Sequence, residues 1–161
     1  MKINPLQKED WQAVQKIYQE GMDTGIATFE TQCPDWETWN SKFLQKCRIV
    51  VEKDNQILGW AALSPTSKRL VYKGVVEVTI YIDLKQTGKG IGTQLMSTLV
   101  QASEEAGFWT LQSSIFSENK SSIKLHQRAG FRIVGTREKI AKRNGIWKDT
   151  LFLERRSPLI N

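Results

Sequence analysis

The feature that most constrains the fold is a β-branched run that passes through a glycine-rich turn into a periodic apolar segment. Residues 75–82 read Val-Val-Glu-Val-Thr-Ile-Tyr-Ile, three alternating glycines lie within 88–92, and apolar residues then recur at helical spacing as far as Ala106. Such a run is typical of a strand, and glycines permit a tight turn because they carry no Cβ. We predict a strand, a turn, and a helix that stops at Gly107.

The main-chain N–H groups of residues 88–92 can converge on an anion at the positive end of the following helix. This turn is therefore a candidate phosphate cradle. A P-loop is excluded because Asp83 stands at its first glycine position and Gly90, not a hydroxyl residue, follows Lys89. A dinucleotide-binding turn is excluded because Thr93 stands at its third glycine position. A strand-to-helix turn without any ligand remains the alternative.

The remaining pattern predicts one domain, 1–161, in which strands come first as hairpins and later alternate with helices. This order favours a mixed α+β sheet, and 161 residues suffice for one core without disulfide or metal staples. The expected strands cover about 2–6, 48–52, 57–63, 75–82, 108–116, 131–135 and 147–154, with helices over about 9–22, 35–45, 91–106 and 120–129.

Composition argues against a nucleic-acid partner and against a membrane span. The net charge is +6, but the basic residues are scattered, which favours a solvated surface over a nucleic-acid face. No apolar run is long enough to span a membrane, and residues 1–5 lack the apolar centre of a signal peptide. Cys33 and Cys47 are too far apart for a Cys-x-x-Cys motif and suit reduced thiols. We expect a cytoplasmic protein.

A second motif makes the glycine turn more specific. Residues 119–131 read Asn-x-x-Ser-x-x-Leu-His-x-x-x-Gly-Phe, and together with 88–92 they resemble the GCN5-related N-acetyltransferase (GNAT) superfamily. The resemblance implies an α+β GNAT fold with a mixed, mostly antiparallel sheet of about seven strands, about four flanking helices and splayed central strands. Further runs resemble the phosphinothricin and methionine-sulfoximine acetyltransferase branch: 27–31, 69–72, 76–82 and 145–149.

Acetyl transfer to an amine needs a neutral nitrogen, and an α-amino group with a pKa of roughly 8 benefits from a positioned base. Alternation places Glu77, Thr79 and Tyr81 on one face of the strand. By itself this pattern favours a plain polar sheet face. The resemblance implies that Glu77 is the general base.

His126 is the only histidine, which excludes a multi-histidine metal site, and we expect no metal. A Ser122–His126 hydrolase pair one helical turn apart is disfavoured, because no Gly-x-Ser-x-Gly elbow surrounds the serine. The superfamily commonly has a tyrosine here that protonates the departing thiolate. The resemblance therefore makes His126 a candidate general acid or substrate contact, and a packed histidine beside Leu125 is the alternative.

The resemblance also implies acetyl-CoA as co-substrate and assigns residues to it and to the acceptor. One departure concerns Thr87, which stands where the superfamily has Gln or Arg, and we expect weaker or water-assisted cofactor contact there. The residues assigned to the cofactor are Ile80, Tyr81, Ile82, Thr87, Gly88, Lys89, Gly90, Ile91, Gly92, Thr93, Asn119 and Ser122. Those assigned to the acceptor are Phe29, Arg69, Leu70, Val71 and Tyr72.

The sequence thus predicts an N-acetyltransferase that acts on the α-amino group of a small amino acid or analogue, such as phosphinothricin, methionine sulfoximine or its sulfone. Attack on acetyl-CoA would be direct, and the resembling branch suggests a homodimer. Two alternatives remain open. The same fold could acetylate a protein N-terminus or lysine, or the chain could be an acyl-CoA-binding regulatory module without turnover.

Overall fold

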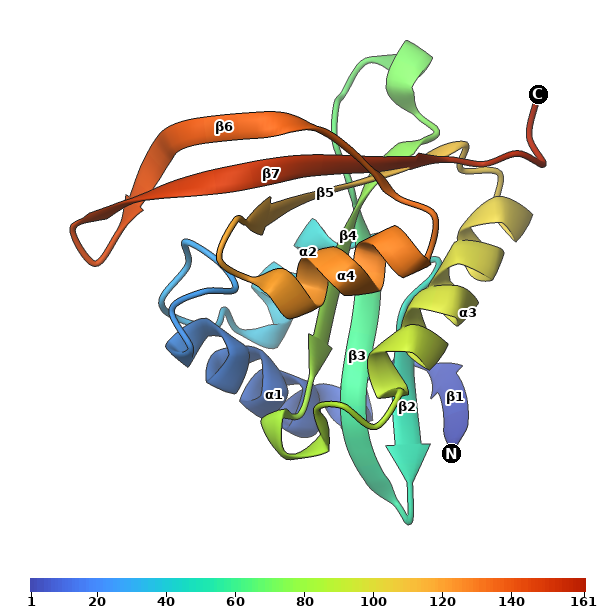
Figure 1. Cartoon of the computed structure of the whole chain (residues 1–161). Helices are drawn as coiled ribbons and strands as arrows, with labels where there is room; N and C mark the ends of the chain where they lie inside the picture. The colour runs from blue at the N-terminus through green and yellow to red at the C-terminus, as the bar shows by residue number, and fades with distance from the viewer.

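The computed structural model describes all 161 residues, and they form one seven-stranded sheet with helices on both faces (Figure 1). The strand order is β1-β2-β3-β4-β5-β7-β6, and only the β4–β5 pair is parallel. The predicted mixed, mostly antiparallel sheet is confirmed. The strands are β1 (Lys2–Pro5), β2 (Ile49–Lys53), β3 (Gln56–Pro65), β4 (Val75–Ile82), β5 (Thr110–Phe116), β6 (Arg132–Arg143) and β7 (Ile146–Arg156).

Four α-helices flank the sheet, two on each face (Figure 1). Helices α3 and α4 cover one face, and α1 and α2 cover the other. Their bounds are α1 (Trp11–Asp23), α2 (Trp36–Lys42), α3 (Ile91–Glu105) and α4 (Lys120–Arg128), and three short 3-10 helices are η1 (Lys8–Asp10), η2 (Leu70–Tyr72) and η3 (Leu84–Gln86).

The two faces bury cores of different character. The face under α3 and α4 is aliphatic, with Leu95, Leu99 and Leu153 completely buried. The face under α1 and α2 is aromatic, and the ring centroids of Trp39 and Trp60 lie 5.5 Å apart. Because both faces of β3 and β4 are covered, these two strands are held rigidly at the centre of the molecule.

The central strands separate after a short contact. β4 pairs with β5 only from Val75 to Glu77, opposite Thr110 to Gln112. β5 then continues beside β7 as far as Phe116, while the rest of β4 is paired only with β3. The predicted splay of the central strands is present and leaves one edge of β4 open.

Two elements differ in length from the sequence prediction. Helix α2 ends at Lys42 rather than near residue 45, because Phe43 adopts an extended backbone with φ −95° and ψ 146°. Strand β6 was predicted to end near residue 135 but continues to Arg143, forming with β7 a long hairpin that reaches across the molecule (Figure 1). The pairing is irregular between Arg137 and Ala141, where charged residues obscure the alternating pattern.

Candidate active site

Glu77 lies on β4 at the point where β4 and β5 separate. It stands opposite Ser64 of β3 and Gln112 of β5, and its side chain is on the face covered by α1 and α2. Burial raises the pKa of the Glu77 carboxyl, and the positive charge of Lys42 opposes this shift. A carboxylate with a raised pKa is a stronger proton acceptor than one in water, so Glu77 has the properties of a general base.

Lys42 lies above this face at the end of α2. Its Nζ is 3.6 Å from Oε1 of Glu30, which belongs to the loop between α1 and α2. The Leu44 N–H donates to the Leu63 carbonyl at 2.8 Å, which fixes the end of α2 against β3 next to the residue that faces Glu77. The face around Glu77 therefore carries one cation and a second carboxylate.

An aromatic wall continues the same face along β4. The Tyr81 ring stacks on Trp60 at 5.5 Å and contacts Tyr18 of α1 at 4.8 Å. Gly21 allows α1 to approach this closely, since a Cβ there would collide with the Tyr81 ring. The Tyr18 hydroxyl donates to Glu30 at 3.5 Å. Trp60 and Tyr18 are themselves buried, so Tyr81 is the ring of this wall that a small molecule on the face could touch.

The open edge of β4 exposes main-chain groups of alternate residues. The Asp83 N–H donates to the Leu58 carbonyl at 2.9 Å, so by ladder alternation Tyr81 exchanges its main-chain bonds with Trp60. The main-chain groups of Ile80 and Ile82 therefore face the gap left by β5. Of the three residues predicted to contact the cofactor here, Ile80 and Ile82 present main-chain groups to the gap. The main chain of Tyr81 is bonded to β3, and its side chain lies on the face under α1 and α2.

The glycine turn precedes α3 in the conformation its residues permit. Gly88 and Gly90 have φ of 81° and 80°, and nothing lies within 4 Å of a Cβ placed on either. The Gln94 N–H is bonded to the Gly90 carbonyl at 3.1 Å, so the amides of residues 91–93 have no partner in an earlier helical turn. This open arrangement of amides at a helix start suits a phosphate group.

Neighbouring side chains of the turn are engaged within the chain. The Thr87 hydroxyl donates to the Leu84 carbonyl at 2.9 Å, and the Lys89 ammonium donates to Gln86 at 3.1 Å. Thr93 lines a groove of about 330 Å³ between α3 and α4. The turn therefore presents main-chain N–H groups to an anion, and position 87 has no long side chain that could bind it.

Asn119 and Ser122 shape the start of α4. The Asn119 carboxamide oxygen accepts from the Ser122 N–H at 3.3 Å and caps the helix. The Ser122 carbonyl lies 2.7 Å from His126 Nδ1. Since a carbonyl only accepts, His126 carries its proton on Nδ1 in the neutral ring.

His126 is almost completely buried, with 2% of its surface exposed, and its ring meets Phe131 edge-on at 5.0 Å. Burial lowers the His126 pKa, and Nε2 has no hydrogen-bond partner. In this tautomer Nε2 can accept a proton but has none to give. The structure therefore favours a packed histidine over a general acid for this side chain.

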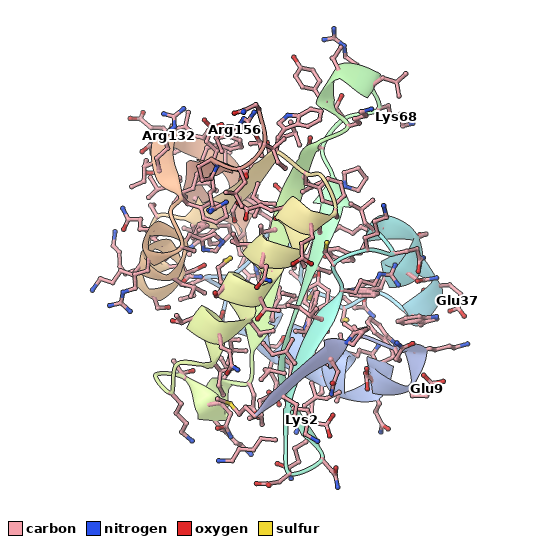
Figure 2. All side chains as sticks on the ribbon, turned by 90° about the vertical axis from the view of Figure 1, so that its right-hand side faces the viewer. Lys2, Glu9, Glu37, Lys68, Arg132 and Arg156 are labelled. Atoms are coloured by element: carbon pink, nitrogen blue, oxygen red, sulfur yellow. The ribbon has the colours of Figure 1, made fainter.

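The residues predicted to bind the acceptor are divided between two places. Phe29 packs against Phe116 at 4.6 Å, where the loop after α1 meets the end of β5. Arg69 stacks over Tyr72 at 5.3 Å on the loop between β3 and β4, which projects beyond the sheet (Figure 1), with Lys68 marking its position in Figure 2. Leu70 and Val71 on this loop are exposed. Within one chain, this projecting loop is not gathered around Glu77.

The structure adds residues to the site that the sequence reasoning missed. Tyr18 had the helical spacing of a core residue, and that spacing was its only signal. Lys42 and Glu30 have no local pattern that pairs them, because they lie on different elements. Arg143 reaches the loop after α1 from the far end of β6. Each contact depends on tertiary structure.

No three His, Cys, Asp or Glu side chains are arranged to bind a metal ion. None of the helices has both the length and the apolar character needed to cross a membrane.

Comparison with known proteins agrees with this geometry. The acetyltransferase (GNAT) family matches residues 11–131. An L-methionine sulfoximine/L-methionine sulfone acetyltransferase of Pseudomonas aeruginosa is 32% identical over 108 residues, which are 66% of this chain and 63% of that protein.

Two solved structures share the fold over nearly the whole chain. Ribosomal-protein-alanine N-acetyltransferase from Brucella melitensis gives a TM-score of 0.89 at 25% identity, covering 98% of this chain and 100% of that one. A phosphinothricin acetyltransferase from Sinorhizobium meliloti, solved in complex with AcCoA, gives 0.84 at 28% identity, covering 96% and 87%. With a family match over most of its length and this shared fold, the chain belongs to the acetyltransferase (GNAT) family.

Proposed function

We propose that the protein is an acetyl-CoA-dependent N-acetyltransferase that acts on the α-amino group of a small amino-acid-like acceptor. The observation that carries this proposal is the position of Glu77. It is a partly buried carboxylate with a raised pKa, and it is the last residue of β4 that pairs with β5. A proton acceptor therefore lies directly beside the open strand edge.

The residues along that edge fit acetyl-CoA. The main-chain groups of Ile80 and Ile82 face the gap, and the amides of residues 88–93 lead into α3, with open space beside Gly88 and Gly90. Together they form a strand edge for an amide-containing arm followed by a cradle for its phosphates. When bound, acetyl-CoA supplies an acetyl group as a thioester.

The chain's own groups have defined tasks in the reaction. Glu77 takes a proton from the acceptor's ammonium, directly or through water, and the free nitrogen then attacks the thioester carbonyl. A C–N bond forms and the C–S bond breaks. The nitrogen loses its second proton as the amide forms, and the departing sulfur takes up one proton, so that of the two protons released one is on Glu77 and one is on the thiol. A main-chain N–H on the open edge of β4 donates to the carbonyl oxygen as negative charge develops there.

A small acceptor is supported by what surrounds Glu77. Tyr81, backed by the buried rings of Tyr18 and Trp60, lies on the same face of β4, and the Lys42–Glu30 pair joins α2 to the loop after α1. The relatives named for methionine sulfoximine and phosphinothricin act on compounds of this class. The zwitterion of an amino acid matches a face that carries both signs of charge.

A protein N-terminus is the second candidate acceptor. The observation that favours it is the exposed apolar loop Leu70–Val71–Tyr72, together with the similarity to ribosomal-protein-alanine N-acetyltransferase. A peptide could lie along such a surface while its amino group reached Glu77. This acceptor and a small amino acid make opposite predictions in one assay.

The test measures thiol release from acetyl-CoA at about pH 8, where an amine is substantially neutral, across free amino acids, methionine sulfoximine, phosphinothricin and short peptides. Turnover of small amino acids that is lost in Glu77→Gln supports the proposal. Turnover of peptides alone supports the second candidate. Acetyl-CoA binding without turnover of any acceptor, unchanged by Glu77→Gln, would indicate a binding module.

We also propose that the protein forms a homodimer through the β6–β7 hairpin. β6 is the edge strand of the sheet, and Ile133, Val134, Ile146 and Trp147 on the hairpin are all exposed. A long edge strand whose hairpin carries these exposed apolar side chains is suited to pairing with a second copy. Light scattering should give twice the monomer mass, and a monomer at high protein concentration contradicts this proposal.

A further inference from the structure

The loop between α1 and α2 borders the face around Glu77 but has no regular structure of its own. Residues 24–31 carry Thr28, which lies beside the Tyr81 hydroxyl, as well as Phe29 and Glu30. A loop of this kind keeps one shape only if contacts from elsewhere hold it. The position of this wall relative to Glu77 therefore depends on those contacts.

One side chain from far along the sequence bonds both to the end of α1 and to the loop. Arg143, the last residue of β6, is 8% exposed. Its Nη2 donates to the Met22 carbonyl at 2.9 Å and its Nε donates to the Thr28 carbonyl at 3.3 Å. Because the guanidinium is planar and rigid, these two bonds set the distance between the end of α1 and the loop.

The hairpin that carries Arg143 is itself anchored. Arg143 pairs with Ile146 across the turn, and the Lys142 ammonium lies 4.8 Å above the Trp147 ring. Further along β7, the Asp149 carbonyl accepts from the Ser117 N–H at 3.1 Å. The hairpin is thus tied to the segment that leads from β5 into α4, and Arg143 extends this fixed framework to the loop after α1.

The chemistry of Arg143 indicates more than packing. A buried charge is costly unless it is paired, and Arg143 makes no ion pair with a carboxylate in this structure. A neutral apolar residue would fill the same space without that cost. What the guanidinium provides is two directed hydrogen bonds to main-chain carbonyls of the acceptor-side wall.

We infer that Arg143 is a positioning residue for the acceptor: it fixes residues 24–31 against Tyr81 and thereby sets the fit of the acceptor beside Glu77. This inference rests on the proposed function for its kinetic consequence. Its structural consequence, a loop that is held by Arg143, stands without it. Arg143 contacts neither the glycine turn nor the open edge of β4, so cofactor binding should be independent of it.

The test compares Arg143→Met and Arg143→Lys with the control Arg137→Met. Arg137 is an exposed arginine on the same strand whose guanidinium lies over Phe152 at 5.6 Å. We expect Arg143→Met to lower kcat/KM for the acceptor roughly 10- to 100-fold, as for a misplaced binding wall. The acetyl-CoA dissociation constant should stay within about twofold, because the glycine turn is untouched.

Arg143→Lys should recover part of the loss, since an ammonium can reach one of the two carbonyls, and Arg137→Met should behave as wild type. A parallel loss of acetyl-CoA affinity, or an unchanged acceptor kcat/KM in a folded Arg143→Met, overturns the inference. If Arg143→Met fails to fold, Arg143→Lys carries the test, with a smaller acceptor-specific loss expected.

A second readout separates this inference from the proposed function. Hydrogen exchange of the amides in residues 24–31 should be faster in Arg143→Lys and Arg143→Met than in wild type and Arg137→Met. This measurement needs no acceptor. If no acceptor is turned over but the loop exchanges faster, the proposed function fails and the positioning role stands. Unchanged exchange in both Arg143 variants overturns the positioning role.

Discussion

Replacing Arg48 with methionine should destabilise the protein by about 3 kcal/mol, because three main-chain carbonyls lose a hydrogen-bond donor. Arg48 is 7% exposed and lies between the end of α2 and the start of β2. Its guanidinium donates to Asn40 Oδ1 at 2.6 Å and to three carbonyls, those of Leu44 at 2.6 Å, Phe43 at 2.7 Å and Asn40 at 2.8 Å.

The magnitude follows from what the substitution leaves behind. Methionine keeps an apolar stem beside Trp39, whose ring lies 5.0 Å from the Arg48 guanidinium. It cannot donate to the three carbonyls, and each unsatisfied buried acceptor costs about 1–3 kcal/mol. The removed charge offsets part of this loss, because burying it was itself unfavourable. We therefore take the lower end of this cost for each carbonyl.

The assay is urea unfolding followed by tryptophan fluorescence and circular dichroism, with Arg132→Met as the control. Arg132 forms an exposed ion pair with Glu154, and losing such a pair should cost less than about 1 kcal/mol. A loss below about 1 kcal/mol for Arg48→Met, equal to that of the control, would refute the reasoning that these bonds hold the end of α2.

Three further predictions concern the turn and α4. Gly90→Ala should destabilise by about 1–2 kcal/mol through its left-handed backbone and also weaken acetyl-CoA binding in calorimetry, whereas Gly107→Ala, equally left-handed and equally open, should cost only stability; equal effects on binding contradict a role for the turn. Thr87→Gln should tighten acetyl-CoA binding by adding a side-chain donor, and an unchanged dissociation constant counts against that expectation. Burial lowers the folded-state pKa of His126, so the unfolded chain takes up the proton first and stability should fall as the pH drops below about 6.5. Urea unfolding at several pH values should show a smaller fall in His126→Phe, and an equal fall contradicts the assignment of a neutral, packed histidine.

The sequence was most informative where a local pattern and its chemistry coincide. The strand 75–82, the turn after it and the start of α3 at Ile91 are all as predicted. The turn could be predicted because Gly88 and Gly90 have left-handed φ, a conformation that glycine adopts far more readily than other residues. Alternation also placed the side chains of Glu77 and Tyr81 on one face correctly.

Features set by tertiary contacts were not accessible in this way. The end of α2 was misplaced because the aromatic spacing continues to Phe43 although the backbone there is already extended. β6 was predicted too short because it is an exposed edge strand rich in charge, without the buried alternation that marks a strand. Local sequence predicts only a turn around Arg143. Its hydrogen bonds could not be predicted, because its partners lie 115 and 121 residues away in the sequence.

The assignment of Glu77 as the base is the central claim, and its substitution by glutamine tests it without a change of shape. Because burial raises the Glu77 pKa, its charge opposes folding at neutral pH, so Glu77→Gln should be at least as stable as wild type. Any loss of activity in a folded variant then reports on chemistry rather than on stability.

The measurement we would make is the pH dependence of kcat/KM for the best acceptor, in wild type and in Glu77→Gln, with acetyl-CoA binding measured on both. Wild-type activity should fall as the pH drops through the raised pKa of Glu77, and the variant should lose roughly 10²- to 10⁴-fold and that limb of the profile, with acetyl-CoA affinity preserved. A variant that keeps wild-type activity and the same pH profile would contradict the account.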